Sequence, residues 1–120
     1  MAKLISLDID GTLELGDPPG IIPMSFVNRL LSLGYLVGSC SDNTVSFQQK
    51  LWASHGITPH FAVLKQQLDI VRAQFLADSY IHVGDRVTDR IAAKMGGFEY
   101  IDVANLVDEA GEFREDLLLL

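Results

Sequence analysis

A single cysteine, Cys40, occurs among the 120 residues, and one thiol cannot form an internal disulfide. The apolar runs all stay far below the roughly 20 residues that a membrane helix needs, including the closing run of leucines at 117–120. The first ten residues also lack the long apolar segment and the cleavage site of a secretory signal. We therefore expect a soluble, cytoplasmic protein whose fold depends on a packed core.

Basic residues are scarce as well. The chain has 9 Lys and Arg against 16 Asp and Glu, which gives a net charge of −7. Such a charge repels polyanions unless a local basic patch exists, so nucleic acid is a disfavoured partner. Internal repeats and low-complexity linkers are absent, and 48% of the residues are apolar. These features predict one globular domain, residues 1–120, with a core of its own.

Apolar runs alternate with amphipathic stretches of helical length. The predicted strands are residues 3–9, 35–41, 60–64, 79–85 and 99–103. The predicted helices are residues 25–34, 44–55, 66–77 and 89–97. Gly34 is expected to end the first helix, Asn43 or Thr44 to cap the second, and Thr88 to cap the fourth.

This alternation predicts an α/β fold, because consecutive parallel strands need right-handed helical crossovers. The result is a Rossmann-like, doubly wound sheet of about five strands that is covered by helices on both faces. Ligands in such sheets bind outside the carboxyl ends of the strands. The polar residues expected there are Asp8 and Asp10 after the first strand, Ser41 after the second, Lys65 after the third, and Asp85 with Asp89 after the fourth.

Carboxylates that are grouped at one edge raise the pKa values of one another unless a cation neutralises them. A set of oxygen ligands without histidine or cysteine suits a hard divalent cation such as Mg²⁺. Lys65 adds a second positive charge, and Ser41 can donate a hydrogen bond. A metal and a lysine among carboxylates form a receptor for a phosphate dianion.

Four segments carry a family resemblance: DIDGT at 8–12, GYLVGSCS at 34–41, Lys65, and GDRVTD at 84–89. They are similar to the four ordered motifs of the haloacid dehalogenase superfamily, and the match spans residues 4–103. The first motif is highly specific, and the fourth supports it in the right order. The resemblance implies a Rossmann-like hydrolase whose first aspartate is phosphorylated while a phosphate ester is cleaved.

The resemblance also implies a role for each catalytic residue. Asp8 is the nucleophile, and Asp10 is the general acid and base. Ser41 and Lys65 hold the phosphoryl oxygens. The division between the aspartates is chemically sound, since one carboxylate can attack phosphorus while a second, protonated one supplies the proton that a leaving alkoxide needs.

The metal set follows from the same resemblance. Mg²⁺ is expected to be held by Asp8, by the backbone carbonyl of Asp10 and by Asp85. Asp89 is either a further ligand or the residue that orients Lys65. Gly11 permits the tight turn at the strand exit, and Thr12 is expected to hydrogen-bond within that turn.

The sequence departs from the family pattern at two motifs. Many members have asparagine directly after the serine of the second motif, whereas Asp42 and then Asn43 follow Ser41 here. Gln66 follows Lys65, in place of a frequent proline. An EF-hand loop is the competing interpretation of DIDG, but it requires a third acidic or amide position and a later glutamate.

The spacing leaves no room for a cap domain. Only 28 residues separate Thr12 from Ser41 and 23 separate Ser41 from Lys65, and these are the intervals in which members of the family insert caps. Residues 13–22 can form a short flap at most. An open site suits a phosphoprotein, a sugar phosphate or another small phosphoester. Two alternatives are a non-catalytic interaction module that keeps the metal site, and phosphotransfer to an acceptor other than water.

Other reactive residues have structural interpretations. His55, His60 and His82 show no ligand spacing and are expected at the surface or with satisfied hydrogen bonds. Cys40 and Trp52 are expected in the core. Arg86 and Arg90 flank the last motif, where a solvated helix face competes with a substrate contact.

The apolar C-terminal tail, residues 113–120, allows two interpretations. It could join a homo-oligomer, whose neighbouring subunit would also control water at the uncapped site. It could instead dock on the edge of its own sheet and leave a monomer.

Overall fold

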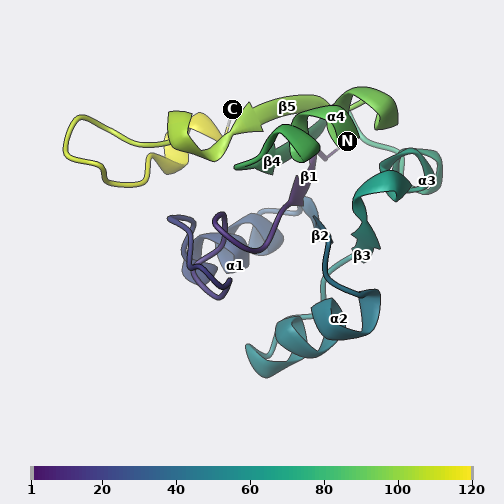
Figure 1. Cartoon of the computed structure of the whole chain (residues 1–120), viewed down its shortest axis with the longest axis horizontal. Helices are drawn as coiled ribbons and strands as arrows, with labels where there is room; N and C mark the ends of the chain where they lie inside the picture. Colours follow the sequence, from purple (N-terminus) through teal and green to yellow (C-terminus); the bar gives the residue numbers. More distant parts are fainter. Residues whose placement is uncertain (1, 120) are drawn as a thin grey trace.

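Strands and helices alternate along the chain as the sequence predicts (Figure 1). The computed structural model describes residues 2–119. The strands are β1 Leu4–Leu7, β2 Leu36–Ser41, β3 Phe61–Leu64, β4 Tyr80–Gly84 and β5 Glu99–Asp102. The helices are α1 Met24–Ser32, α2 Val45–Ser54, α3 Leu68–Gln74 and α4 Val87–Gly96. Three 3₁₀ turns complete the set: η1 Lys65–Gln67, η2 Val103–Asn105 and η3 Glu115–Leu117.

The five strands form one parallel sheet in the order β3-β2-β1-β4-β5. The central strand β1 pairs with β2 on one side and with β4 on the other, so that Leu7 lies opposite both Ser39 and Val83. The chain winds outward from β1 to β3 and then crosses to β4. The order of the strands therefore reverses between β1 and β4, which is where a doubly wound sheet binds ligands.

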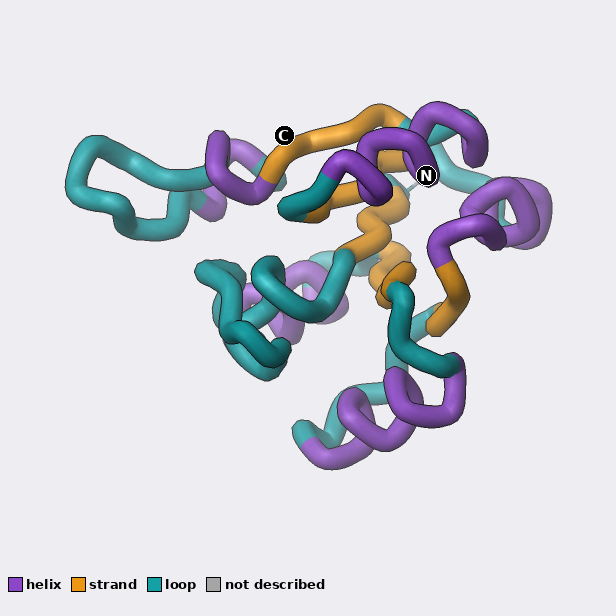
Figure 2. The backbone as a smooth tube through the Cα atoms, in the orientation of Figure 1, coloured by secondary structure: helices purple, strands orange, loops and turns teal. Residues whose placement is uncertain are grey.

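Helices cover both faces of the sheet, and each face has its own core (Figures 1 and 2). Alternate residues of β1 point to opposite faces. Ile5 and Leu7 pack in the core beneath α1 and α2, whereas Leu4 packs in the core beneath α3 and α4. The arrangement is the expected Rossmann-like, three-layer α/β/α architecture.

The helix caps were predicted only in part. Thr44 caps α2, where its side chain accepts a hydrogen bond from the backbone of Phe47, so Asn43 is not the cap. Gly34 follows α1 with a φ of +87°, as expected. Thr88 was wrongly predicted to cap α4, which already begins at Val87. Its hydroxyl instead lies 3.0 Å from Nζ of Lys65.

Helix α3 ends earlier than predicted. It stops at Gln74, and Phe75 is extended, with φ −116° and ψ 129°. The ring of Phe75 packs against Phe61, with 5.9 Å between centroids, and against His60. Partial burial of this aromatic ring beside β3 outweighs the helical pattern that continues in the sequence.

Residues 13–22 form the expected short flap at the end of β1. A bridge between Leu13 and Ile22 closes it. A β-carbon at Gly20 would lie only 2.2 Å from the backbone of Thr12, so the flap folds tightly against the strand exit. The interval from Thr12 to Ser41 also holds α1, and the interval from Ser41 to Lys65 holds α2 and β3. These elements fill the places at which a cap would be inserted.

The C-terminal tail docks on its own chain, beside α1 rather than along the free sheet edge. Leu118 is buried in the core beneath α1 and α2, and Phe113 packs edge-on against Phe26. Arg29 and Glu115 form an ion pair across the same contact. This docking removes the tail as an argument for a homo-oligomer, which stays an untested prediction. Among the described residues, no helix combines the length and apolar character that crossing a membrane requires.

Candidate active site

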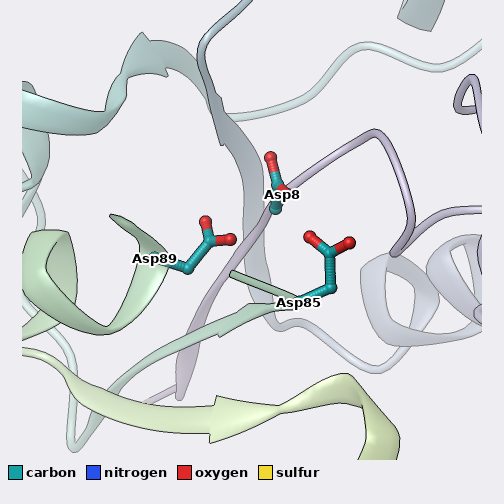
Figure 3. A group of neighbouring side chains, drawn as sticks. All are labelled: Asp8, Asp85 and Asp89. Carbon is teal, nitrogen blue, oxygen red and sulfur yellow. The ribbon is translucent and has the colours of Figure 1, made fainter. Parts of the chain in front are cut away.

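Three carboxylates converge where the strand order reverses (Figure 3). Asp8 directly follows β1, Asp85 directly follows β4, and Asp89 lies in the first turn of α4. One oxygen from each lies within 4.8 Å of the other two. Asp8 and Asp89 are buried and Asp85 is exposed, so the group opens to solvent on one side. A divalent cation fits this oxygen-only donor set.

Two motif glycines make room for these carboxylates. Gly11 has a φ of +76°, and a β-carbon there would lie 2.1 Å from a carboxylate oxygen of Asp85. A β-carbon at Gly84 would lie 2.2 Å from the carboxylate carbon of Asp89. The glycines therefore permit both the backbone turn and the approach of the acids.

The role of Gly11 can be separated from backbone strain by comparison with Gly56. Both residues have positive φ, but nothing lies within 4 Å of a β-carbon at Gly56. Gly11→Ala and Gly56→Ala should each cost about 1 to 2 kcal/mol of stability through that strain. Only Gly11→Ala should weaken Mg²⁺ binding, by roughly 10- to 100-fold, as displaced metal-site residues do. Titration calorimetry with Mg²⁺ measures the difference, and equal affinities would contradict the steric role.

The pKa values of the carboxylates diverge. Burial and the charge of Asp89 raise the pKa of Asp8 to about 8, against a smaller opposing effect of Lys65. Burial acts in the same direction on Asp89, but its hydrogen bond to His82, the charge of His82 and the charge of Lys65 lower its pKa overall. Without a metal, Asp8 is therefore protonated below about pH 8, whereas Asp89 is ionised.

This proton predicts a pH-dependent stability. The pKa of Asp8 rises from an unfolded value of about 3.9 to about 8, so its stabilising effect is complete below about pH 4 and is lost as the pH rises through 8. The metal-free protein should melt at a lower temperature at about pH 9 than at about pH 6. Mg²⁺ bound at Asp8 would displace this proton, so the affinity of the protein for Mg²⁺ should increase about tenfold per pH unit below pH 8.

Thermal melts with Mg²⁺ or with a chelator, recorded across this pH range, test both effects. The variant Asp8→Asn is the control, since the amide does not ionise in this pH range. A stabilisation by Mg²⁺ that is independent of pH would contradict the assignment of the proton to Asp8.

Lys65 is the buried cation of the site. Its Nζ lies 3.3 Å from Asp89, 3.3 Å from Asp42 and 3.0 Å from the hydroxyl of Thr88. Burial by itself would lower the pKa of Lys65, but the charges of Asp8, Asp89 and Asp42 raise it. The ammonium therefore stays protonated. Its contact with Asp89 matches the orienting role that the sequence left open.

His82 of β4 is a buried histidine that contacts Asp89. The Nε2 atom of His82 lies 2.9 Å from Asp89, and its Nδ1 atom lies 2.9 Å from the hydroxyl of Ser6. His82 thus has two satisfied ring nitrogens, as predicted for a structural histidine. Its contact with Asp89 was not foreseen. The strand register pairs His82 with Ser6, whereas Asp89 reaches His82 from the first turn of α4, so the sequence pattern carried no signal for this contact.

Both oxygens of Asp89 are thereby occupied. Oδ1 contacts His82 and Lys65, and Oδ2 accepts a hydrogen bond from the backbone N–H of Arg86. Asp8 and Asp85 complete the group of three carboxylates that could hold a cation. Asp89 contacts Lys65 and also belongs to this group, so its two expected roles stay predictions.

Two hydrogen bonds hold the side chain of Asp10, which does not belong to the group of three converging carboxylates. Its Oδ1 accepts a hydrogen bond from the backbone of Asp17 at 2.9 Å, and its Oδ2 accepts one from the side chain of Asn43 at 3.3 Å. The carboxylate is thus held apart from the group formed by Asp8, Asp85 and Asp89.

Asn43 links Asp10 to Ser41 and was missed by sequence reasoning. Its backbone and side-chain N–H groups both donate to the hydroxyl oxygen of Ser41, each at 3.0 Å. Among the described residues, these contacts leave the hydroxyl hydrogen of Ser41 free to donate to a ligand. The family pattern, with asparagine directly after serine, was the available signal. Here the asparagine comes one residue later, and Asp42 turns to Lys65 instead.

The predicted catalytic residues meet in one hollow, which we call the acidic pocket. Its volume is about 70 Å³, and its lining residues are Asp8, Asp10, Ser41, Asp42, Lys65 and Arg86. Arg86 therefore faces the pocket, as its substrate-contact interpretation requires. Arg90 instead lies over the ring of Tyr100, with 5.7 Å to the centroid. Asp85 and Asp89 lie beside the pocket, against Asp8.

Three further expectations have clear outcomes. Thr12 hydrogen-bonds within the turn, as expected, but through its backbone N–H, whereas its buried hydroxyl has no hydrogen-bond partner among the described residues. The turn is closed by backbone contacts instead, including Thr12 N–H to the carbonyl of Ile9. Cys40 and Trp52 are core residues as predicted, and Trp52 donates to the hydroxyl of Ser39.

Comparisons with protein-family models, with curated proteins and with solved structures found no match to this chain. The resemblance to the haloacid dehalogenase superfamily therefore rests on its motifs alone. The acidic pocket itself supplies the chemical argument for function.

Proposed function

We propose that this protein is a Mg²⁺-dependent phosphatase of the haloacid dehalogenase type, which hydrolyses phosphate monoesters through an aspartyl phosphate on Asp8. The observation that carries the proposal is the convergence of Asp8, Asp10, Ser41 and Lys65 on one pocket. A nucleophilic carboxylate, a second carboxylate, a hydroxyl donor and a fixed cation are the groups that phosphoryl transfer requires.

The residues present fit Mg²⁺. Asp8 and Asp85 offer carboxylate oxygens within one small space. Burial and the charge of Asp89 raise the pKa of Asp8, and a bound cation would offset this cost of its ionised form. The backbone carbonyl of Asp10 would complete the protein ligands that the resemblance implies. When bound, Mg²⁺ would neutralise carboxylate and phosphoryl charge, so that a dianionic ester can approach an acidic site.

In the first step, a carboxylate oxygen of Asp8 attacks phosphorus, and the bond between phosphorus and the alcohol oxygen breaks. Asp10 transfers its proton to that oxygen, so the product leaves as a neutral alcohol. Lys65 and Ser41 donate hydrogen bonds to the phosphoryl oxygens, and Arg86 adds a second positive charge at the pocket. Asp89 and Thr88 hold the ammonium of Lys65 in place.

In the second step, Asp10 takes a proton from a water molecule, which attacks the same phosphorus atom. The bond between phosphorus and Asp8 breaks, which releases inorganic phosphate and restores the carboxylate. Asp10 is again protonated and ready for the next substrate. Its hydrogen bonds to Asp17 and Asn43 keep it at the pocket throughout.

The substrate is a small phosphate monoester or a phosphoprotein, met in the cytoplasm. The short flap and the absence of a cap among the described residues leave the pocket accessible. The net charge of −7 disfavours nucleic acid. A homo-oligomer would supply a neighbouring surface over this open site.

Hydrolysis of p-nitrophenyl phosphate by the purified protein tests the proposal. Turnover should require Mg²⁺ and fall to the background rate when a chelator is in excess, because the acidic pocket otherwise repels the substrate. A panel of phosphomonoesters should accompany it. Turnover that persists in chelator would exclude a metal-dependent mechanism, and a flat panel together with measurable Mg²⁺ binding would favour a non-catalytic module.

A further inference from the structure

A second hollow adjoins the acidic pocket. It lies between η1, α3 and α4, has a volume of about 300 Å³, and is here called the side groove. Asp42 and Lys65 line both hollows. The acidic pocket, about 70 Å³, has less than a quarter of the volume of the side groove. It has room for a phosphoryl group, and the remainder of a substrate must lie elsewhere.

The walls of the side groove are mainly apolar. Leu68 of α3 and Ala92 of α4 form buried parts, whereas Ile91 and Met95 of α4 are 52% and 80% exposed. Large apolar side chains that gather beside a site indicate a binding surface. The flexible thioether chain of Met95 can adapt to ligands of different shape.

The polar residues of the side groove restrict what it accepts. Asp42 and Lys65 form an ion pair at the threshold between the two hollows. Asp69 lines the groove beyond this threshold, and no cation other than Lys65 is among the lining residues. A second anionic group on a ligand would therefore be repelled, while an uncharged apolar group would remove Ile91 and Met95 from water.

We propose that the side groove binds the alcohol part of the substrate, and that the substrate is a monoester of an uncharged, apolar alcohol. This inference rests on the proposed phosphatase function. The phosphoryl group sits in the acidic pocket beside Lys65, and the organic chain extends over the threshold toward Ile91 and Met95. Esters with a second phosphate or a carboxylate are poor substrates.

The test measures kcat/KM for the series from ethyl to hexyl phosphate. A buried methylene corresponds to roughly a fourfold change in binding, so kcat/KM should increase about two- to fourfold per methylene. Ile91→Ser should reduce this increase. The matched control is Ile70→Ser, since Ile70 has a similar exposure of 49% on the neighbouring helix but does not line the groove. It should leave the increase unchanged.

Each other outcome is decisive. Equal hydrolysis of all esters would overturn the groove assignment and leave the phosphatase function standing. If neither these esters nor p-nitrophenyl phosphate nor the phosphomonoester panel is hydrolysed, the proposed function fails, and calorimetry with hexylphosphonate against methylphosphonate still tests the groove in the presence of Mg²⁺. Equal affinities would overturn it. A second copy of the chain could cover the groove instead of the substrate, and sedimentation of the wild type and of Ile91→Ser tests this. A dimer that the substitution dissociates would overturn the groove assignment.

Discussion

Asp8→Asn should abolish turnover. We expect kcat to fall by roughly 10⁴- to 10⁶-fold, as it does when the nucleophile is removed from a set of catalytic residues that act together. An amide oxygen is a poor nucleophile toward phosphorus, so no covalent intermediate should form. Acid quenching with radiolabelled substrate should trap a phosphoryl group on the wild-type protein and none on the variant. Initial rates with p-nitrophenyl phosphate give the size of the loss.

The same substitution should make the metal-free protein more stable. The raised pKa of Asp8, about 8, means that the ionised carboxylate is disfavoured in the folded state at higher pH, and a neutral amide avoids this cost. The melting temperature at about pH 9 without Mg²⁺ should therefore increase by several degrees. Lost activity in a more stable protein separates catalysis from folding. Asp8→Ala is a second variant that cannot regain the aspartate by deamidation, as Asp8→Asn can. Turnover above about one hundredth of the wild-type rate in both variants would refute the nucleophile assignment.

Asp10→Asn should slow turnover by roughly 10²- to 10⁴-fold, the usual contribution of a general acid or base. Mg²⁺ affinity should be kept, because the expected metal contact of this residue is its backbone carbonyl. The loss should be larger for ethyl phosphate than for p-nitrophenyl phosphate, since a nitrophenolate leaves without protonation. Parallel rate measurements with the two esters, and calorimetry with Mg²⁺, give these quantities.

Asp42→Asn is the matched control for Asp10→Asn. Asp42 also lines the acidic pocket, but it pairs with Lys65 and has no proton-transfer role. Its neutralisation should change the rates for both esters by the same factor. A defect in Asp10→Asn that is equal for the two esters, or a loss of Mg²⁺ affinity as severe as in Asp85→Asn, would show that Asp10 is not the general acid.

The sequence by itself determined the fold class and the place of the candidate site. Strands of a parallel sheet that is buried on both faces are short apolar runs, so β1, β2, β3, β4 and β5 were recognisable from hydrophobicity and period. Polar residues directly after such runs must lie at one edge of the sheet. Asp8, Asp10, Ser41 and Lys65 could therefore be assigned to one site from their positions in the sequence, and they share one pocket.

Element ends were less predictable, because contacts between distant segments decide them. Thr88 is a good capping residue by type, yet its hydroxyl contacts Lys65, which is 23 positions away in the sequence. The helical pattern of residues 66–77 continues past Gln74, but Phe75 leaves the helix to pack against Phe61. Local propensities amount to less than about 1 kcal/mol per residue, so even the partial burial of one aromatic ring can outweigh them.

Only the tertiary structure decided how the charges are shared. The sequence contains equivalent aspartates at 8 and 89, but burial and neighbouring charge raise the pKa of Asp8, while His82 and Lys65 lower that of Asp89. The side groove also arises only when α3 packs against α4, which brings Leu68 beside Gly96. Periodicity and residue type are local properties of a chain. Desolvation, electrostatic coupling and the shape of a groove depend on which distant segments pack together, so the local sequence pattern does not predict them.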